Sequence, residues 1–296
     1  MKHVLIAALI AAGFSFGSTV KAAEQASEAA QADADTVFIE QFNAPSLDRS
    51  VWNVIVTGEV FNNEQQAYID STSAISPVNE TDAPGAHDGA LALTAAYRPG
   101  FTTRDGRKFD FTSGRIDTRG KKEFTYGTFS ARMKLPAGDG FWPAFWLLGQ
   151  GRWPDVGEID IMENVGEADW TSVAIHGPKY SGETPLVNKF FFDGKTDITD
   201  WHVYSVEWTK EGMIFRIDGR MIYRATRAMV EHYGRWAFDA PKFIILNLAL
   251  GGVYPAKTSR IDKPYYGMSA STVETIKNGA GRVLVDWVLV TQPKAR

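Results

Sequence analysis

The run Glu158–Ile159–Asp160–Ile161–Met162–Glu163 constrains the fold and function of this chain more than any other segment. Its apolar residues are those of a buried strand, where an ionised side chain is costly unless it is paired or put to use. Folding alone does not explain three acids in six residues. We infer that the run carries chemistry and that the rest of the chain holds this strand and the surface before it.

The spacing of the three acids makes a geometric prediction. Residues two apart in a strand share a face, so Glu158 and Asp160 point together, whereas Glu163 would face the opposite side. One extra residue, a β-bulge near Met162, would restore the parity and bring all three carboxylates onto one face. The two glutamate Cα atoms then lie roughly 13 Å apart. Side chains leaning inward would bring their carboxyl groups to roughly 5–6 Å, as in a retaining glycosidase.

Such a pair of glutamates predicts acid–base and nucleophilic chemistry. One glutamate would attack an anomeric carbon, while the other would protonate the leaving oxygen and later activate water. Asp160 between them would hydrogen-bond the nucleophile and tune its pKa. The alternatives are an exposed acidic face or a cation site, although Ca²⁺ sites usually take their oxygen ligands from loops. The spacing does not say which glutamate has which role.

The N-terminus predicts export. A short basic start precedes an apolar run from Val4 to Phe16, and small residues follow up to Ala22 and Ala23. We interpret residues 1–23 as a signal peptide, because the run is shorter than a membrane span. Residues 24–35 are Ala-rich and acidic and indicate a flexible tether. The protein is therefore expected to be secreted, to the periplasm or the medium.

Composition excludes several classes of partner. The net charge of -4 and the lack of a Lys/Arg block argue against a nucleic-acid partner. The absence of cysteine excludes disulfides and thiolate metal sites. Beyond the N-terminus, no segment is apolar enough to span a bilayer, so no membrane partner is expected. Nine Trp residues fit either a large core or aromatic platforms for flat ligands.

The remaining chain, residues 36–296, has the pattern of one all-β domain. Alternating strands separated by turns recur at short intervals, and helical stretches are confined to residues 225–233 and 271–277. This pattern favours an antiparallel sandwich or barrel. The strands expected from the sequence are 37–39, 89–94, 127–135, 201–208, 213–217, 220–223, 243–250 and 283–290.

The acidic run resembles the signature of glycoside hydrolase family 16, in the bulged form of laminarinases (endo-β-1,3-glucanases), agarases and carrageenases. The arrangement is most similar to that of laminarinases. The similarity covers almost the whole mature domain and is carried by Phe42–Asn43, Leu47–Asp48, Asn62–Tyr68, Ser113–Thr118, Leu135–Gly138, Trp142–Leu148, His176–Pro178, His202–Trp208 and Leu246–Gly252.

The resemblance implies a fold and a set of roles. The fold would be a β-jelly-roll whose concave sheet forms a substrate cleft. Glu158 would be the nucleophile, Glu163 the acid/base and Asp160 the assisting carboxylate. The expected activity is endo-hydrolysis of β-1,3-glucan with retention, by a monomer that needs no cofactor for catalysis. An agarase- or carrageenase-like galactan hydrolase and a non-catalytic glycan-binding module are the alternatives, the second disfavoured by the intact carboxylates.

Several residues are expected to contact the sugar. Trp142 and Trp146 are four apart on a strand and share a face, which suits stacking on pyranose rings, although Trp is more often used in cores. Trp153 in the loop before the acidic strand is a similar candidate. The resemblance adds Asn63 and Arg115, which would hydrogen-bond sugar hydroxyls, and His176, which would line the cleft. None of these three would be chosen from spacing alone.

The resemblance also implies a structural Ca²⁺ on the convex side of the fold. Its ligands would come from an N-terminal strand residue, a glycine carbonyl of the next strand and an aspartate of the last strand. Here Glu40, Gly89 and Asp286 occupy those places. Nothing in their spacing indicates the site independently.

Overall fold

The computed structural model describes residues 34–57 and 60–294. The expected signal peptide, and the expected tether up to residue 33, lie outside the described residues. The first strand, β1 (Ala34–Glu40), begins two residues before the expected domain start at Thr36. It begins there because it pairs with the last strand over its full length, with Ala34 opposite Pro293.

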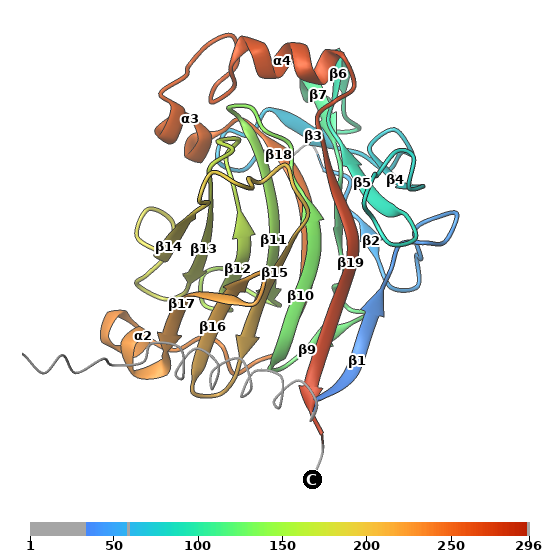
Figure 1. Ribbon diagram of the computed structural model, residues 1–296. Coiled ribbons are helices and arrows are strands. Elements are labelled where there is room, and N and C mark those ends of the chain that lie inside the picture. The colour runs from blue at the N-terminus through green and yellow to red at the C-terminus, as the bar shows by residue number, and fades with distance from the viewer. Residues whose placement is uncertain (1–33, 58–59, 295–296) are drawn as a thin grey trace, which may run out of the picture.

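Within the described residues, two eight-stranded sheets and one small sheet form the fold (Figure 1). The first, which we call the β19 sheet, has the order β17 (Arg220–Thr226), β16 (Gly212–Ile217), β15 (His202–Trp208), β10 (Gly127–Lys134), β19 (Arg282–Pro293), β5 (Ala90–Thr94) and β4 (Ile75–Val78), with β1 beside β19.

The second, the β12 sheet, has the order β14 (Leu186–Phe191), β13 (Trp170–His176), β12 (Glu158–Glu163), β11 (Phe141–Gly149), β18 (Lys242–Leu250), β8 (Arg115–Asp117) and β2 (Asn53–Val54), with β9 (Glu123–Phe124) beside β18. The small sheet contains β3 (Gln66–Tyr68), β7 (Lys108–Ser113) and β6 (Ala96–Thr102). Every strand pair is antiparallel except β3–β7. The expected all-β sandwich of antiparallel sheets is confirmed.

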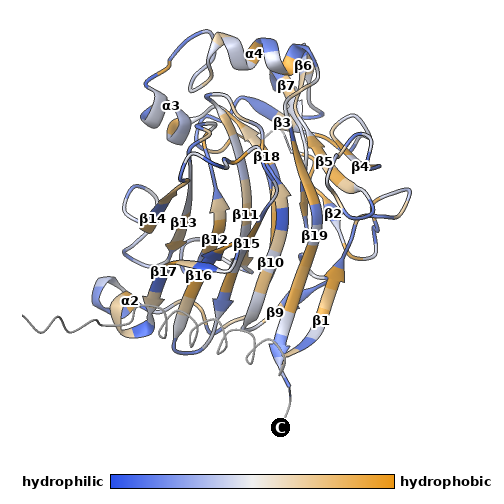
Figure 2. Cartoon of the chain, viewed as in Figure 1, coloured by the Kyte–Doolittle hydropathy of each residue, from blue (hydrophilic) through white to orange (hydrophobic). Residues whose placement is uncertain are grey.

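The two large sheets share one hydrophobic core, as the alternation along β11 illustrates. Phe145 and Leu147 are fully buried between the sheets, while Trp142 and Trp146 on the opposite face remain partly exposed. Figure 2 shows many of the hydrophobic residues on the strands of the two large sheets. The β12 sheet therefore buries one face in the core and presents the other, which we call the carboxylate face because Glu158 lies on it.

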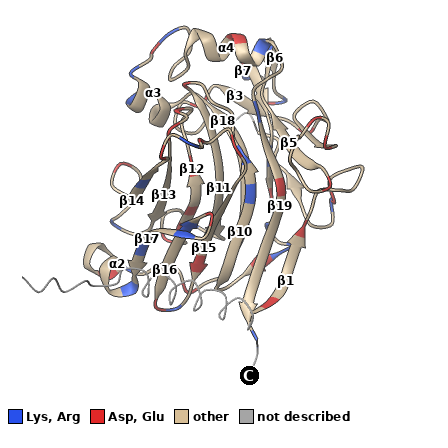
Figure 3. Cartoon of the chain, in the orientation of Figure 1, with Lys and Arg blue, Asp and Glu red and all other residues tan. Residues whose placement is uncertain are grey.

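Among the residues that the structure describes, three short helices lie at the ends of the sheets. The two expected helices are confirmed as α2 (Arg227–Tyr233) and α4 (Ala270–Lys277), whereas α3 (Val253–Ser259) was not expected from the sequence. Figure 1 shows α3 and α4 at one end of the sandwich and α2 toward the other. Across the described residues no helix has the length and apolarity to cross a bilayer. Figure 3 shows Lys and Arg spread over many strands and loops.

Candidate active site

The predicted bulge in β12 is present. Phe145 of β11 pairs with Met162, and the next β11 residue, Trp146, pairs with Asp160, so Ile161 has no partner on that strand. On the other side, Asp160 pairs with Ala174 of β13 and Glu163 pairs with Ser172. A step of three residues along β12 is therefore matched by a step of two along β13. Ile161 and Met162 are both buried in the core, which turns Glu163 to the side of Asp160. The parity argument is confirmed, with the extra residue at Ile161 beside Met162.

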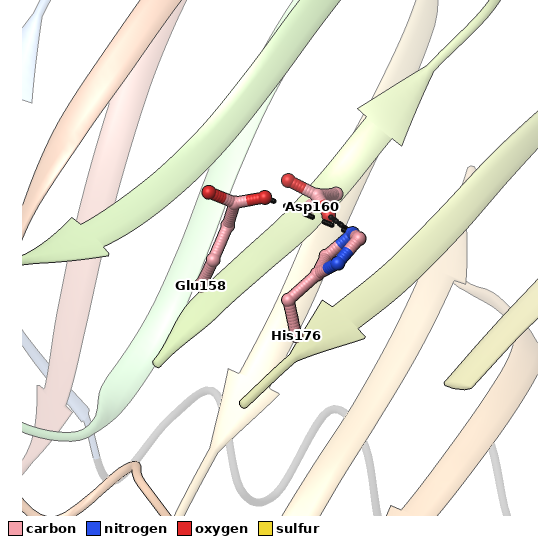
Figure 4. A group of neighbouring side chains, drawn as sticks. All are labelled: Glu158, Asp160 and His176. Atoms are coloured by element: carbon pink, nitrogen blue, oxygen red, sulfur yellow. Dashed lines mark ion pairs between the residues drawn. The ribbon is translucent and has the colours of Figure 1, made fainter. Parts of the chain in front are cut away.

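Glu158, at the start of β12, is held from both sides. The Trp153 indole Nε1 donates a hydrogen bond to Glu158 Oε2 at 3.1 Å. His176 of β13 lies opposite Glu158 in the strand register, and its Nε2 is 3.7 Å from Oε1. Figure 4 shows the imidazole reaching across toward both acids of the strand. The Glu158 carboxylate is thus oriented while its side chain keeps 16% of its surface exposed.

Asp160, in the middle of β12, is buried, and one of its carboxylate oxygens accepts no hydrogen bond. Its Oδ2 lies 3.2 Å from His176 Nε2, close enough for an ion pair (Figure 4). The same oxygen has no hydrogen bond of acceptable alignment. Only 6% of the side chain is exposed. A buried carboxyl in this state is costly to ionise, which sets it apart from an acid that only stabilises the fold.

Glu163, at the end of β12, is oriented by an aromatic pair. Trp142 Nε1 donates a hydrogen bond to Glu163 Oε1 at 3.0 Å. The Trp142 ring meets the ring of Tyr254 from α3 edge-on, with centroids 5.7 Å apart. The Tyr254 hydroxyl is 3.4 Å from Ser172 Oγ on β13. Each glutamate therefore receives one indole N–H, from Trp142 at one end of the strand and Trp153 at the other.

The three carboxyls hinder one another's ionisation. Burial, and then the charge of Asp160, raise the pKa of Glu158 to about 8, although His176 opposes the shift. Burial and the charge of Glu163 raise the pKa of Asp160 well above its usual range. Burial also raises the pKa of Glu163, against the hydrogen bond from Trp142. The group holds protons near neutral pH, and neutralising one carboxyl makes the next easier to ionise.

Trp146 and Arg115 lie together on the neighbouring part of the same sheet. The Arg115 guanidinium carbon is 5.0 Å from the centre of the Trp146 ring, and Trp146 Nε1 donates to Asn247 Oδ1 at 2.8 Å. Asn247 Nδ2 in turn donates to the Tyr68 hydroxyl at 3.3 Å. The Arg115 Nε is buried with no hydrogen-bond partner.

Asn63 lies apart from this group. It is exposed and lines a cavity of about 560 Å³ together with Glu64 and Tyr265. Gly252 lies between Asn63 and the acids. A side chain added at Gly252 would meet the carbonyl of Asn62 on one side and the ring of Trp142, the partner of Glu163, on the other. The structure therefore brings together Glu158, Asp160, Glu163, Trp142, Trp146, Trp153, His176 and Arg115, and places Asn63 in an adjoining cavity.

Sequence reasoning did not select three residues beside this group. Asn247 was detectable, since it is the one amide in the apolar strand β18. Glu64 is half-buried, and its burial raises the pKa of its carboxyl, but nothing in the sequence distinguishes it from a surface acid. Tyr254 belongs to α3, which was itself not expected.

Two groups of residues are candidates for holding a cation. Glu158, Asp160 and His176 each offer a ligand atom, all within 4.8 Å of one another. The expected Ca²⁺ residues fit poorly: the Asp286 carboxylate faces the guanidinium of Arg132, and both Glu40 oxygens accept internal hydrogen bonds. A calcium ion could not use the Asp286 carboxylate without displacing Arg132. Binding of Ca²⁺ through Glu40, Gly89 and Asp286 remains a prediction.

Comparisons with known proteins agree with this geometry. The model of "Glycosyl hydrolases family 16" matches residues 65–288. The chain is 33% identical over 232 residues to a β-glucanase of Rhodothermus marinus, covering 74% of this chain and 77% of that one. It is 32% identical to glucan endo-1,3-β-glucosidase A1 of Niallia circulans, over 73% of this chain but only 34% of the longer relative.

Solved structures give the same result. The endo-β-1,3-glucanase of Pyrococcus furiosus superposes with a TM-score of 0.75 and 29% identity, over 89% of this chain and 96% of that one. The family match spans the bulged strand β12 and the residues around it, including Trp142, His176 and Asn247. The sequence similarity, the shared fold and the carboxylate geometry together establish that this chain belongs to glycosyl hydrolase family 16.

Proposed function

We propose that this protein is an endo-acting β-1,3-glucanase that hydrolyses laminarin-type glucans with retention of configuration. The observation that carries the proposal is the bulge at Ile161, which sets Glu158, Asp160 and Glu163 on one face of β12. Relatives named β-glucanase and endo-1,3-β-glucosidase support the choice of a β-glucan as the polysaccharide. The carboxylate face would form the substrate cleft.

The proposed reaction begins with Glu158 as nucleophile. Its ionised carboxylate attacks the anomeric carbon while the protonated Glu163 delivers a proton to the leaving glycosidic oxygen. The bond between the anomeric carbon and that oxygen breaks, and a glycosyl ester on Glu158 forms. Glu163 then takes a proton from water, which attacks the ester and releases the product. This order of roles comes from the family pattern.

The environment of each acid fits these roles. The raised pKa of Glu163 keeps a proton available for the leaving group. Asp160, whose pKa is raised further, would be protonated and able to donate a hydrogen bond to the nucleophile. Burial is the main cause of the raised pKa of Glu158; neutral neighbours would remove the smaller part that comes from the charges of Asp160 and Glu163 and so make Glu158 easier to ionise. His176 favours the same carboxylate.

The residues around the acids would hold the sugar. Trp142 and Trp146 present indole rings on the carboxylate face, where they can stack on pyranose rings. Arg115 lies against the Trp146 ring, where its guanidinium could donate hydrogen bonds to sugar hydroxyls. Trp153, with 44% of its surface exposed, would cover the entry side of Glu158. Asn63 would act from the adjoining cavity.

Several broader expectations stand as part of this proposal. Residues 1–23 would direct export, and the residues from 24 up to the start of β1 at Ala34 would separate the signal from the folded domain. The mature enzyme would act as a monomer on an extracellular or periplasmic polysaccharide, without a catalytic cofactor. Full-length expression, followed by mass determination of the exported protein, tests the cleavage point after Ala22 or Ala23.

The decisive test of function is reducing-end release from laminarin, lichenan, agarose and κ-carrageenan under identical conditions. The proposal expects hydrolysis of laminarin with oligosaccharide products of mixed length. The Glu163→Gln variant should bind laminarin without cleaving it. Hydrolysis of the galactans alone would replace the substrate, and binding of glucan with no hydrolysis by the wild type would make the chain a glycan-binding module.

A further inference from the structure

Lys242 is a lysine without exposed surface, at the first position of β18. Its ammonium donates hydrogen bonds to three backbone carbonyls: that of Val156 at 2.7 Å, that of Gly157 at 3.1 Å and that of Ala237 at 3.3 Å. All three donors of the ammonium are therefore used. The reaction described above makes no use of this residue.

The surroundings of the ammonium are otherwise apolar. It lies 5.6 Å from the ring centre of Trp208 and 5.2 Å from that of Phe238. None of the ion pairs found among the described residues includes Lys242, and the charged groups acting on it are Glu158 and Asp239, through space. A buried cation without a bonded counter-ion is costly, and an apolar side chain would fill this space more cheaply.

Two of the carbonyls that Lys242 binds, those of Val156 and Gly157, belong to the turn that precedes the acidic strand, and the third, that of Ala237, belongs to the segment before β18. Gly157 adopts φ = 70°, and an added side chain there would collide with the Ala237 carbonyl. The next residue is Glu158, and the same turn carries Trp153, which hydrogen-bonds Glu158. The position of this turn therefore determines where Glu158 and its hydrogen-bonding partner Trp153 lie.

The turn has little packing on one side. A cavity of about 480 Å³ is lined by Val156 and Ala237, two of the residues whose carbonyls bind Lys242. Three carbonyl dipoles that converge without a donor would repel one another, and the cavity gives the turn room to move apart. The ammonium opposes this movement because it attracts all three oxygens at once.

We propose that Lys242 is a positioning residue, whose buried ammonium gathers the carbonyls of Val156, Gly157 and Ala237 and thereby fixes Glu158 for attack on the sugar. The inference rests on the proposed function, in which Glu158 is the nucleophile. Lys242 touches no substrate. It acts through the backbone of the turn.

Burial lowers the pKa of Lys242 to about 7, against the charges of Glu158 and Asp239. The three carbonyl contacts, and not a charge effect on Glu158, carry the role of Lys242.

The first experiment compares wild type, Lys242→Met and Val285→Ala on laminarin. Methionine keeps the length of the side chain without its charge, and Val285→Ala removes core volume in the β19 sheet as a control for general destabilisation. We expect Lys242→Met to lower kcat roughly 10- to 100-fold, as small misplacements of a reacting group do. KM should change by less than about twofold. Val285→Ala should leave both unchanged per folded molecule.

A chemical rescue separates charge from volume. The chain has no cysteine, so Lys242→Cys creates a single thiol that can be alkylated in denaturant before refolding. Aminoethylation restores an ammonium at nearly the original position, whereas propylation gives a neutral group of similar length. Wild type taken through the same steps is the control. The aminoethylated protein should regain kcat, and the propylated protein should not.

Equal activity of the two alkylated proteins, or a wild-type kcat for Lys242→Met, would overturn the proposal. Hydrogen exchange of the segment 150–160 gives a readout independent of catalysis, and exchange there should be faster in Lys242→Met than in Val285→Ala. Should wild type hydrolyse none of the polysaccharides, the proposed function fails. Unchanged exchange in the segment would contradict the role of Lys242 by itself.

Discussion

Two buried aspartates, one in the middle of each large sheet, have opposite environments. Asp286 on β19 has 2% of its side chain exposed and is bonded to the guanidinium of Arg132, to the His87 ring at 2.6 Å and to the His87 backbone N–H at 3.1 Å. Asp160 on β12 is 6% exposed, and its ion-pair contact is with His176, without an aligned hydrogen bond to its Oδ2.

The difference shows how one fold uses the same side chain in two ways. The Asp286 charge is compensated by a cation and by backbone, so it links β19 to β10 and to the loop carrying His87. Asp160 is placed beside Glu158 and Glu163, where its charge is unfavourable. The buried acid of the β19 sheet is thus paired and hydrogen-bonded. The acids of the β12 sheet lack such compensation, and groups with pKa values shifted in this way are typical of reactive sites.

The largest expected effect comes from the acids of β12. Glu163→Gln should lower kcat on laminarin by about 10³-fold, within the range for loss of a general acid–base group. The free energy of unfolding should stay the same or rise, because a buried carboxyl that repels its neighbours is removed. Steady-state kinetics and urea unfolding measure the two quantities. A stable variant with wild-type kcat would mean that Glu163 is not the acid/base.

Asp160→Asn probes the assisting carboxyl. We expect kcat to fall roughly 10- to 100-fold, because the amide can still donate a hydrogen bond but cannot share a proton with the two glutamates. The unfolding free energy should not decrease. A loss of stability without a loss of kcat would place Asp160 in the same structural class as Asp286.

Asp286→Asn is the matched substitution in the other sheet. It should lower the free energy of unfolding by about 3 kcal/mol, the lower end of the range for breaking a buried pair, because Arg132 retains 20% exposure. The kcat per folded molecule should remain within about twofold of wild type. A comparable loss of kcat would show that the convex side of the fold is coupled to the carboxylate face. Thermal unfolding with and without EDTA, in wild type, tests the predicted Ca²⁺ at the same time.

The stability of the protein should also depend on pH. The pKa of Glu158 is raised to about 8, so folding favours its protonated form. This contribution is fully present below the unfolded-state pKa and is lost as pH rises through about 8. Urea unfolding of wild type should therefore show stability declining between pH 5 and 8, and Glu158→Gln should flatten part of that decline. A wild-type curve that rises over this interval would contradict the raised pKa.

Much of the site could be predicted because it depends on the spacing of residues that lie close together in the sequence. Counting residues along β12 was enough to require a bulge between Asp160 and Glu163. The spacing of Trp142 and Trp146 placed both rings on one face. Of the sugar-contacting residues that the resemblance supplied, His176 lies beside the acids, Arg115 lies against Trp146, and Asn63 lies in the adjoining cavity.

The rest depends on contacts between distant segments. Arg132 meets Asp286 across 154 residues, and no pattern in either strand indicates the pair. Lys242, at the start of an apolar strand after Pro241, has the pattern of a surface lysine, yet the turn before β12 closes over it. Such partners follow from how the sheets pack, which short-range periodicity does not contain.

The central claim is that Glu158 is the nucleophile of a retaining reaction on one face of β12. Incubation with a 2-deoxy-2-fluoro-β-laminaribiosyl fluoride, followed by peptide mass mapping, tests it most directly, because the fluorine slows hydrolysis of the glycosyl ester. The account predicts one label, on Glu158, that is absent in Glu158→Gln. A label on Glu163, or inactivation without any covalent label, would contradict it.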